Sequence, residues 1–285
     1  MITILCPKKI SVIGLLLGMS LMLTWIITFS SSPSLATAAL LPSGTPSPES
    51  NATPSVDVLY EQSRALYQAG RVTAALAKLN NLLEIPSADD ADAILLFRTY
   101  FLRGQIYLDR GNIALAISDF TTAIGYQSEI AEAYALRASA YVQQEDFEAA
   151  IDDYTLAIEY DDSESTHYIN RGMVYIMVEN YRLAVADFSE AIVLNPDDSD
   201  GYIYIGEAYL LQDNYSDALI NLDTAIELDP ENVLGYQLRG RVNRGLAQNE
   251  AAIDDFRTYL ELAPEADDRD EIESQIDALQ FQLPE

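Results

Sequence analysis

The sequence has very few of the residues that build catalytic, metal-binding or disulfide-bonded sites. Its one cysteine, Cys6, and its one tryptophan, Trp25, lie near the N-terminus, and His167 is its one histidine. A mature chain would therefore have no thiol for a disulfide, a zinc site or a nucleophile. His167 has no cysteine or second histidine to assist it, so we expect an exposed side chain without a catalytic role. The sequence predicts no catalytic residue, no metal site and no cofactor.

Basic residues are also scarce, because 16 Lys and Arg stand against 45 Asp and Glu. Lys8 and Lys9 precede every acidic residue, so the chain after residue 39 carries 14 basic and 45 acidic groups. This balance repels a phosphate backbone, whereas nucleic-acid binding depends on cations that release its counterions. The charge therefore excludes nucleic acid as a partner.

Residues 1–38 have the order of an export signal. Lys8 and Lys9 are followed by an apolar run, Ile10 to Phe29, and then by small residues at Ala36 and Ala38. This pattern predicts cleavage after Ala38. The run is also long enough to cross a bilayer, so an uncleaved anchor is the alternative, with membrane contact only through residues 10–29. In both cases the lysines stay inside and the rest of the chain is exported, to the periplasm or beyond.

A linker and a repeat array follow the export segment. Residues 39–55 are rich in proline, serine and threonine, which is typical of a disordered tether. From residue 97 to 266 the sequence repeats every 34 residues without an insertion. Each period has a tyrosine at its fourth position and a small residue four positions later. An alanine comes twelve positions after the small residue, and a large apolar side chain follows the alanine by four. These columns are Tyr100, Tyr134, Tyr168, Tyr202 and Tyr236; Gly104, Ala138, Gly172, Gly206 and Gly240; Ala116, Ala150, Ala184, Ala218 and Ala252; and Phe120, Tyr154, Phe188, Leu222 and Phe256.

The columns resemble the tetratricopeptide repeat (TPR), in which each unit is an antiparallel helix pair. The resemblance implies an all-α solenoid, a right-handed superhelix of six repeats. Small residues in two columns let paired helices approach, and the ring fills the remaining space. Asp268 starts a final pattern in which Ile272, Ile276 and Leu279 recur at helical spacing, and this predicts a capping helix at 267–285. The repeats are predicted at 56–96, which is degenerate, and at 97–130, 131–164, 165–198, 199–232 and 233–266, within an array from 56 to 266.

One pair of columns predicts an ion pair inside each repeat. Arginine stands at the seventh position of four repeats, and aspartate follows it by sixteen residues. In the fifth repeat both change together, to Ile205 and Asn221. Because both positions change together, we infer that the two side chains face each other. We therefore predict a partly buried, structural Arg–Asp bridge in each of the other four repeats. The pairs are Arg103–Asp119, Arg137–Asp153, Arg171–Asp187 and Arg239–Asp255.

The resemblance also implies a partner-binding groove, because the first helices of such units line a concave face. Two methionines one helical turn apart suit an adaptable apolar surface, and arginines at one end suit acidic groups of a ligand. The alternative is that the twelfth-position residues, and others among these positions, pack against the next repeat. The implied groove residues are Phe101, Leu102, Leu136, Val142, Ile169, Asn170, Met173, Met177, Ile203, Tyr204, Glu207, Arg241 and Arg244.

These features predict a non-enzymatic, extracytoplasmic scaffold that binds a partner protein or peptide. This expectation comes from the family resemblance, since a fold alone does not give a function. The alternative is a membrane-anchored accessory subunit that spaces or oligomerises envelope components and has no peptide ligand.

Overall fold

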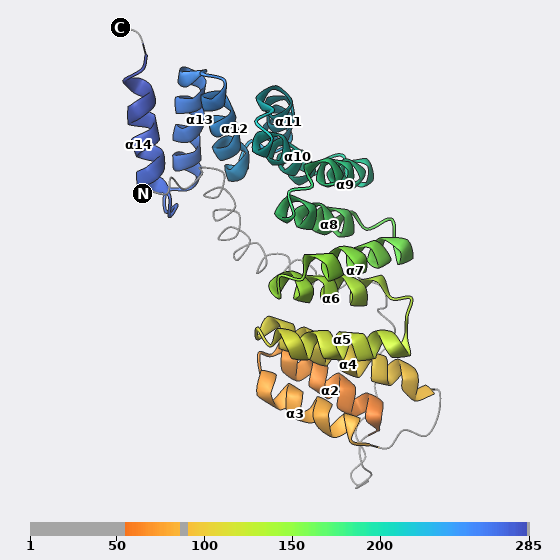
Figure 1. Ribbon diagram of the computed structural model, residues 1–285. Helices are drawn as coiled ribbons and strands as arrows, with labels where there is room; N and C mark the ends of the chain where they lie inside the picture. Colours follow the sequence, from red (N-terminus) through yellow and green to blue (C-terminus); the bar gives the residue numbers. More distant parts are fainter. Residues whose placement is uncertain (1–54, 86–90, 284–285) are drawn as a thin grey trace, which may run out of the picture. The chain divides into compact units, whose positions relative to one another are not determined.

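The computed structural model describes residues 55–85 and 91–283, and this part of the chain contains thirteen helices and no strand (Figure 1). The predicted export segment and nearly all of the predicted linker lie outside the described residues. The helices form two compact units, one ending at Ser128 and the other beginning at Glu129. Their bounds are α2 Val56–Gln68, α3 Val72–Leu83, α4 Ala91–Asp109, α5 Ile113–Tyr126, α6 Ala131–Gln143, α7 Phe147–Tyr160, α8 Ser165–Met177, α9 Tyr181–Leu194, α10 Ser199–Leu211, α11 Tyr215–Leu228, α12 Val233–Gly245, α13 Asn249–Leu262 and α14 Arg269–Gln280.

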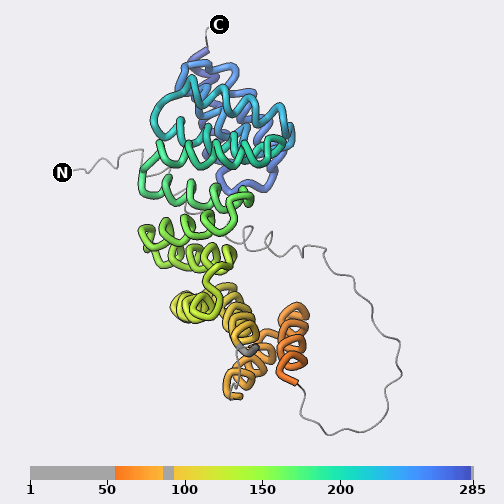
Figure 2. Tube along the Cα trace, turned by 90° about the vertical axis from the view of Figure 1, so that its right-hand side faces the viewer, coloured from red at the N-terminus to blue at the C-terminus, as the bar shows by residue number. Residues whose placement is uncertain are grey.

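The first unit consists of two helix pairs, α2 with α3 and α4 with α5, drawn in orange and yellow in Figure 2. Leu79, Leu82 and Ile106 are buried in its core. Helix α4 begins at Ala91, six residues before the repeat boundary predicted at residue 97.

The second unit stacks four helix pairs and a final helix. Its first helices, α6, α8, α10 and α12, begin at residues 131, 165, 199 and 233, which open the last four predicted repeats. Helix α10 lies against both α8 and α12, whereas the contacts among α9, α11 and α13 are weaker. The stack of pairs is curved (Figure 1), and the first helices of its pairs are α6, α8, α10 and α12. We call these the inner helices, and we call α7, α9, α11 and α13 the outer helices.

Helix α14 covers the last pair, as the apolar spacing predicts. Ile272, Ile276 and Leu279 are buried against Phe256 and Leu260 of α13. A stack of repeats exposes an apolar face at each end unless a polar-faced element covers it. Helix α14 is such a cap, because its remaining residues are mostly polar and exposed.

The small-residue column sets the distance between paired helices. A Cβ on Gly172 would lie 2.6 Å from the ring of Phe188, and one on Gly240 would lie 2.6 Å from the ring of Phe256. In the fifth repeat Leu222 takes the place of the ring against Gly206. The predicted close approach is thus confirmed in these three pairs.

The predicted Arg–Asp bridges form in all four repeats. In the fourth, Arg171 Nε donates to Asp187 at 2.9 Å and Nη2 donates at 2.8 Å, with both side chains largely buried. The remaining arm of the guanidinium reaches the preceding repeat, where Nη1 donates to Thr155 at 3.0 Å. Each bridge therefore joins the two helices of a repeat, and this arginine also joins neighbouring repeats. The other bridges are Arg103–Asp119, Arg137–Asp153 and Arg239–Asp255.

The turns inside the repeats use left-handed backbone. Gly70 and Gly111 have φ of 71°, and the equivalent residues in the later repeats have φ between 56° and 63° although they carry side chains. The next residue donates its N–H to a carbonyl five positions back, as in Asp146 to Tyr141 at 2.9 Å. This is the Schellman ending of a helix, which normally takes glycine at the left-handed position. The later residues are Glu145, Glu179, Asp213 and Ala247.

Candidate functional site

The groove residues predicted from the sequence divide into a buried floor and a more accessible strip. In the second unit Met173, Ile203, Tyr204 and Glu207 are less than a tenth exposed, as is the twelfth-position Val142. For these residues the alternative expectation describes the structure, because they pack within the array. They cannot offer contact area to a partner unless an inner helix shifts.

The accessible strip runs along the inner helices. Leu136, Ile169, Asn170 and Met177 are half-buried, so part of each side chain faces solvent. Arg241 is also half-buried, and Arg244 is exposed on α12. The strip therefore combines apolar side chains on α6 and α8 with cationic ones on α12.

Two predicted groove residues lie in the first unit and are described separately. Leu102 is buried, and Phe101 is half-buried between two rings. Phe101 stacks on Phe97 with 5.4 Å between ring centroids and meets Phe120 edge-on at 5.9 Å. Both residues thus contribute to the core of this unit.

Glu207 and Arg241 form an electrostatic pair on neighbouring inner helices. Burial raises the pKa of Glu207 to about 7, and the charge of Arg241 opposes this rise. Burial also lowers the pKa of Arg241, while the charge of Glu207 raises it. The buried carboxylate of Glu207 and the half-buried guanidinium of Arg241 are both costly to desolvate, and their attraction offsets part of that cost. Sequence reasoning missed this pair, although opposite charges 34 residues apart in one column were a usable signal.

Arg244 lies at the end of the strip, where the cap begins. Its Nη1 donates to the side-chain oxygen of Gln275 on α14. The exposed guanidinium keeps further donors that face solvent. This end of the strip can therefore accept a carboxylate or another anionic group.

His167 is buried, and the expectation of an exposed histidine is wrong. The side chain is 7% exposed in the first turn of α8, and Nδ1 has no hydrogen-bond partner. Burial lowers the pKa of His167, against the charges of Glu164 and Asp161. Burial of this side chain inside the array therefore favours the neutral imidazole. The sequence pattern did not reveal this, because the turn before α8 is polar and exposed.

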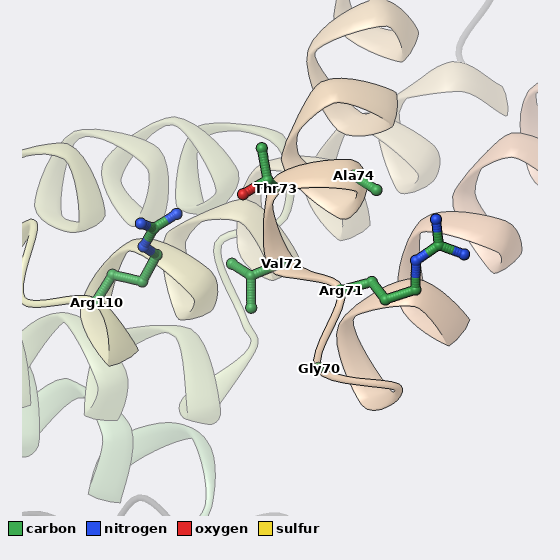
Figure 3. A pocket seen from close by; sticks show the side chains of 6 residues that line it. All are labelled: Gly70, Arg71, Val72, Thr73, Ala74 and Arg110. Carbon is green, nitrogen blue, oxygen red and sulfur yellow. The ribbon is translucent and has the colours of Figure 1, made fainter.

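The first unit has a cavity of about 520 Å³ at its turns, lined by six residues (Figure 3). Arg71 and Arg110 extend to either side of Val72 in this view, so their guanidinium groups do not converge. A binding site needs a few polar groups directed at one point. We therefore assign no ligand to this cavity. Its lining is Gly70, Arg71, Val72, Thr73, Ala74 and Arg110.

Within residues 55–85 and 91–283 no group of His, Cys, Asp and Glu side chains is arranged to hold a metal ion. Among the same residues, no helix combines the length and the hydropathy needed to cross a membrane. What the described chain offers is a curved stack of helix pairs with a partly accessible inner strip. This architecture defines an all-α solenoid of the helical-repeat class.

Comparison with known families identifies the repeat. A tetratricopeptide repeat model matches residues 101–164 and 169–233, and a second model of the same repeat matches residues 205–277. Together the matches cover more than half of the chain. The protein belongs to the tetratricopeptide repeat family. Among curated proteins, none is significantly similar to it in sequence.

Solved structures show the same fold at low sequence identity. A tetratricopeptide repeat protein from Parabacteroides merdae is 20% identical, with a TM-score of 0.67 over 80% of this chain and 88% of its own. PilF from Pseudomonas aeruginosa is 16% identical, with a TM-score of 0.60 over 77% of this chain and 97% of its own. YrrB, described as a TPR protein with an unusual peptide-binding site, is 18% identical, with a TM-score of 0.52 over 62% of this chain and 91% of its own. At these identities the likeness supports the fold alone.

Proposed function

We propose that this protein is a non-enzymatic, extracytoplasmic scaffold that binds a partner protein or peptide along the inner helices of its second unit. One observation carries the proposal: α6 and α8 have partly exposed apolar side chains, and the arginines of α12 lie beyond the buried groove residues of α10. Such a strip suits a segment with apolar side chains at one end and acidic groups at the other. Peptide binding by the structurally similar YrrB supports the same reading.

Export rests on the sequence of residues 1–38, with its two lysines, apolar run and small residues. The mass of the protein recovered from cell fractions tests it. Cleavage after Ala38 removes Trp25, so the exported product should show tyrosine emission alone. Full-length mass in the membrane fraction would instead identify an anchor, and recovery from the cytosol would contradict export.

The binding surface is tested with a matched pair of variants of the full-length protein. Met177→Glu places a charge on the strip, whereas Ile220→Glu places one on the exposed surface of the outer helix α11. Cross-linking in the exported fraction first identifies the partner. Losing a central anchor costs about 2 kcal/mol or more, so Met177→Glu should weaken binding by roughly thirtyfold. Equal affinities of the two variants, with helix content unchanged, would place the partner elsewhere.

A further inference from the structure

A second surface of the second unit lies at the turns that join one repeat to the next. The turns are residues 160–166, 194–200, 228–234 and 262–268. Each connects the end of an outer helix to the following inner helix or to α14. Because the helices alternate in direction, all four turns lie at one edge of the stack. We call this surface the turn edge.

The turn edge carries one sign of charge. Its four segments contain eleven Asp or Glu residues and no Lys or Arg. Some of these carboxylates cap helices, as Asp198 does by accepting from the N–H of Asp200 at 3.0 Å. Six others accept no hydrogen bond from any described residue, so capping does not account for them. The six are Asp162, Asp197, Asp200, Glu231, Glu265 and Asp267.

Neighbouring turns are close enough for their charges to interact. Asn232 donates to the hydroxyl of Ser199 at 3.4 Å, which joins two successive turns. Partial burial raises the pKa of Asp200, and the negative charges of Asp198 and Asp229 raise it further. Repulsion among these carboxylates is unfavourable, and a cationic group bound beside them would reduce it.

An apolar column runs beside these charges. The last residue of each outer helix is a tyrosine or leucine, and each is between 37% and 42% exposed. Tyr160 is the first of the column and stacks on Tyr134 with 5.4 Å between ring centroids, so its ring has a fixed position. Val193, beside Leu194, is 71% exposed. The column consists of Tyr160, Leu194, Leu228 and Leu262.

We propose that the turn edge is a docking surface for a basic amphipathic helix of a partner protein. A helix of about 20 residues is about 30 Å long, and such a helix suits a surface that extends over several successive repeats. Leucine-like side chains of that helix lie on the column, and its lysines or arginines face the turn carboxylates. This surface is separate from the strip on the inner helices, so the two can be occupied independently.

The test uses the full-length protein and three synthetic peptides of roughly 20 residues. The first is an amphipathic helix of leucine and lysine. The second has the same residues in an order that abolishes the apolar stripe, and the third has glutamate in place of lysine. Calorimetric titration should show the first binding about tenfold more tightly than the second, because only the first presents one continuous apolar face. The third should not bind.

Variants locate the contact. Leu194→Ser with Leu228→Ser shortens two members of the column, and Asp162→Asn with Asp197→Asn and Glu231→Gln neutralises three carboxylates that cap no helix. The matched control, Glu148→Gln with Asp152→Asn and Glu250→Gln, removes three exposed charges from the outer helices. Each of these two edge sets, the leucine variant and the carboxylate variant, should weaken binding of the first peptide by about tenfold. The control set should weaken it by less than about twofold.

Several results would overturn the proposal. Equal affinity for the first two peptides would mean attraction by net charge alone, and equal losses in the edge and control sets would mean the same. Absence of binding by the first peptide would show that the turn edge is not a docking surface for such a helix. Loss of binding in Met177→Glu but in neither edge set would move the peptide to the inner helices, which contradicts this inference and leaves the proposed function standing.

Discussion

The ring of Phe188 fills the space that a side chain on Gly172 would need. A Cβ there would lie 2.6 Å from Phe188 Cε1 and 2.9 Å from Cδ1. Both residues are buried in the fourth repeat, so an added methyl group would have to displace the ring or the facing helix. The distance between α8 and α9 therefore depends on the absence of one methyl group.

Gly172→Ala should destabilise the protein by about 1–3 kcal/mol, the usual cost of overpacking a core. The matched control is Gly125→Ala on α5, where an added Cβ meets nothing within 4 Å. Removing a helical glycine there should stabilise by about 0.5–1 kcal/mol. Thermal unfolding followed by circular dichroism compares them, and equal changes in the two variants would contradict the packing argument.

Arg171→Ile should be strongly destabilising, because it leaves Asp187 buried without its partner. Removing one member of a buried pair costs about 3–5 kcal/mol, whereas replacing both can be nearly neutral. Adding Asp187→Asn should recover much of the loss, since the fifth repeat has Ile205 and Asn221 at these positions. A double-mutant cycle in urea measures the coupling. Additive penalties would show that the two side chains contribute independently.

The left-handed turn residues offer a stabilising substitution. Glu179 has φ of 60°, where a side chain costs about 1–2 kcal/mol and glycine does not. Glycine also loses more entropy on folding, so Glu179→Gly should stabilise by about 0.5–1 kcal/mol net. The reverse change, Gly111→Ala at φ of 71°, should destabilise although space is available. Denaturant midpoints check both signs, and a destabilised Glu179→Gly variant would contradict the strain argument.

Glu207 should make stability depend on pH in the direction opposite to an ordinary ion pair. Its pKa rises from 4.5 to about 7 in the folded state, so the folded protein binds more protons between these values. Stability should therefore fall as pH rises from 4.5 to 7. Glu207→Gln removes this loss and should stabilise the protein by at most about 3 kcal/mol at pH 8.

The measurement is thermal unfolding of the wild type and Glu207→Gln from pH 4 to 8. The two should be nearly equally stable at the acid end and diverge as Glu207 ionises. A constant difference across this range would show that Arg241 fully compensates the carboxylate. The same series with Asp152→Asn, an exposed carboxylate on α7, controls for net charge.

Much of the fold follows from spacing in the sequence. Equivalent residues recur every 34 positions and predict helix starts at residues 131, 165, 199 and 233, because each unit packs the same kinds of side chain in the same way. The Arg171–Asp187 bridge was predictable for a related reason. The fifth repeat changes both positions at once, and such a joint change marks two side chains in contact.

The candidate site was less predictable, because repeats fix which positions face inward but not how much of each side chain stays accessible. Met173 and Met177 lie one turn apart on the same helix, yet the first is buried and the second is half-buried. Such a difference is decided by how the neighbouring helices pack around α8, which is a property of the tertiary structure. The burial of His167 has the same origin, since its polar neighbours in sequence predict exposure.

The sequence by itself determined the helix pairs, their register, the capping helix and the four bridges, since these depend on residues that recur at fixed separations within or between adjacent units. Only the tertiary structure decided the curvature, the buried pairing of Glu207 with Arg241, the left-handed turns at residues such as Glu179, and the joining of acidic turns into one edge. These features depend on distances between neighbouring repeats and on backbone strain that the stack tolerates. A repeating sequence pattern specifies which residues are in contact. The distances between neighbouring repeats depend instead on how all of these contacts pack together.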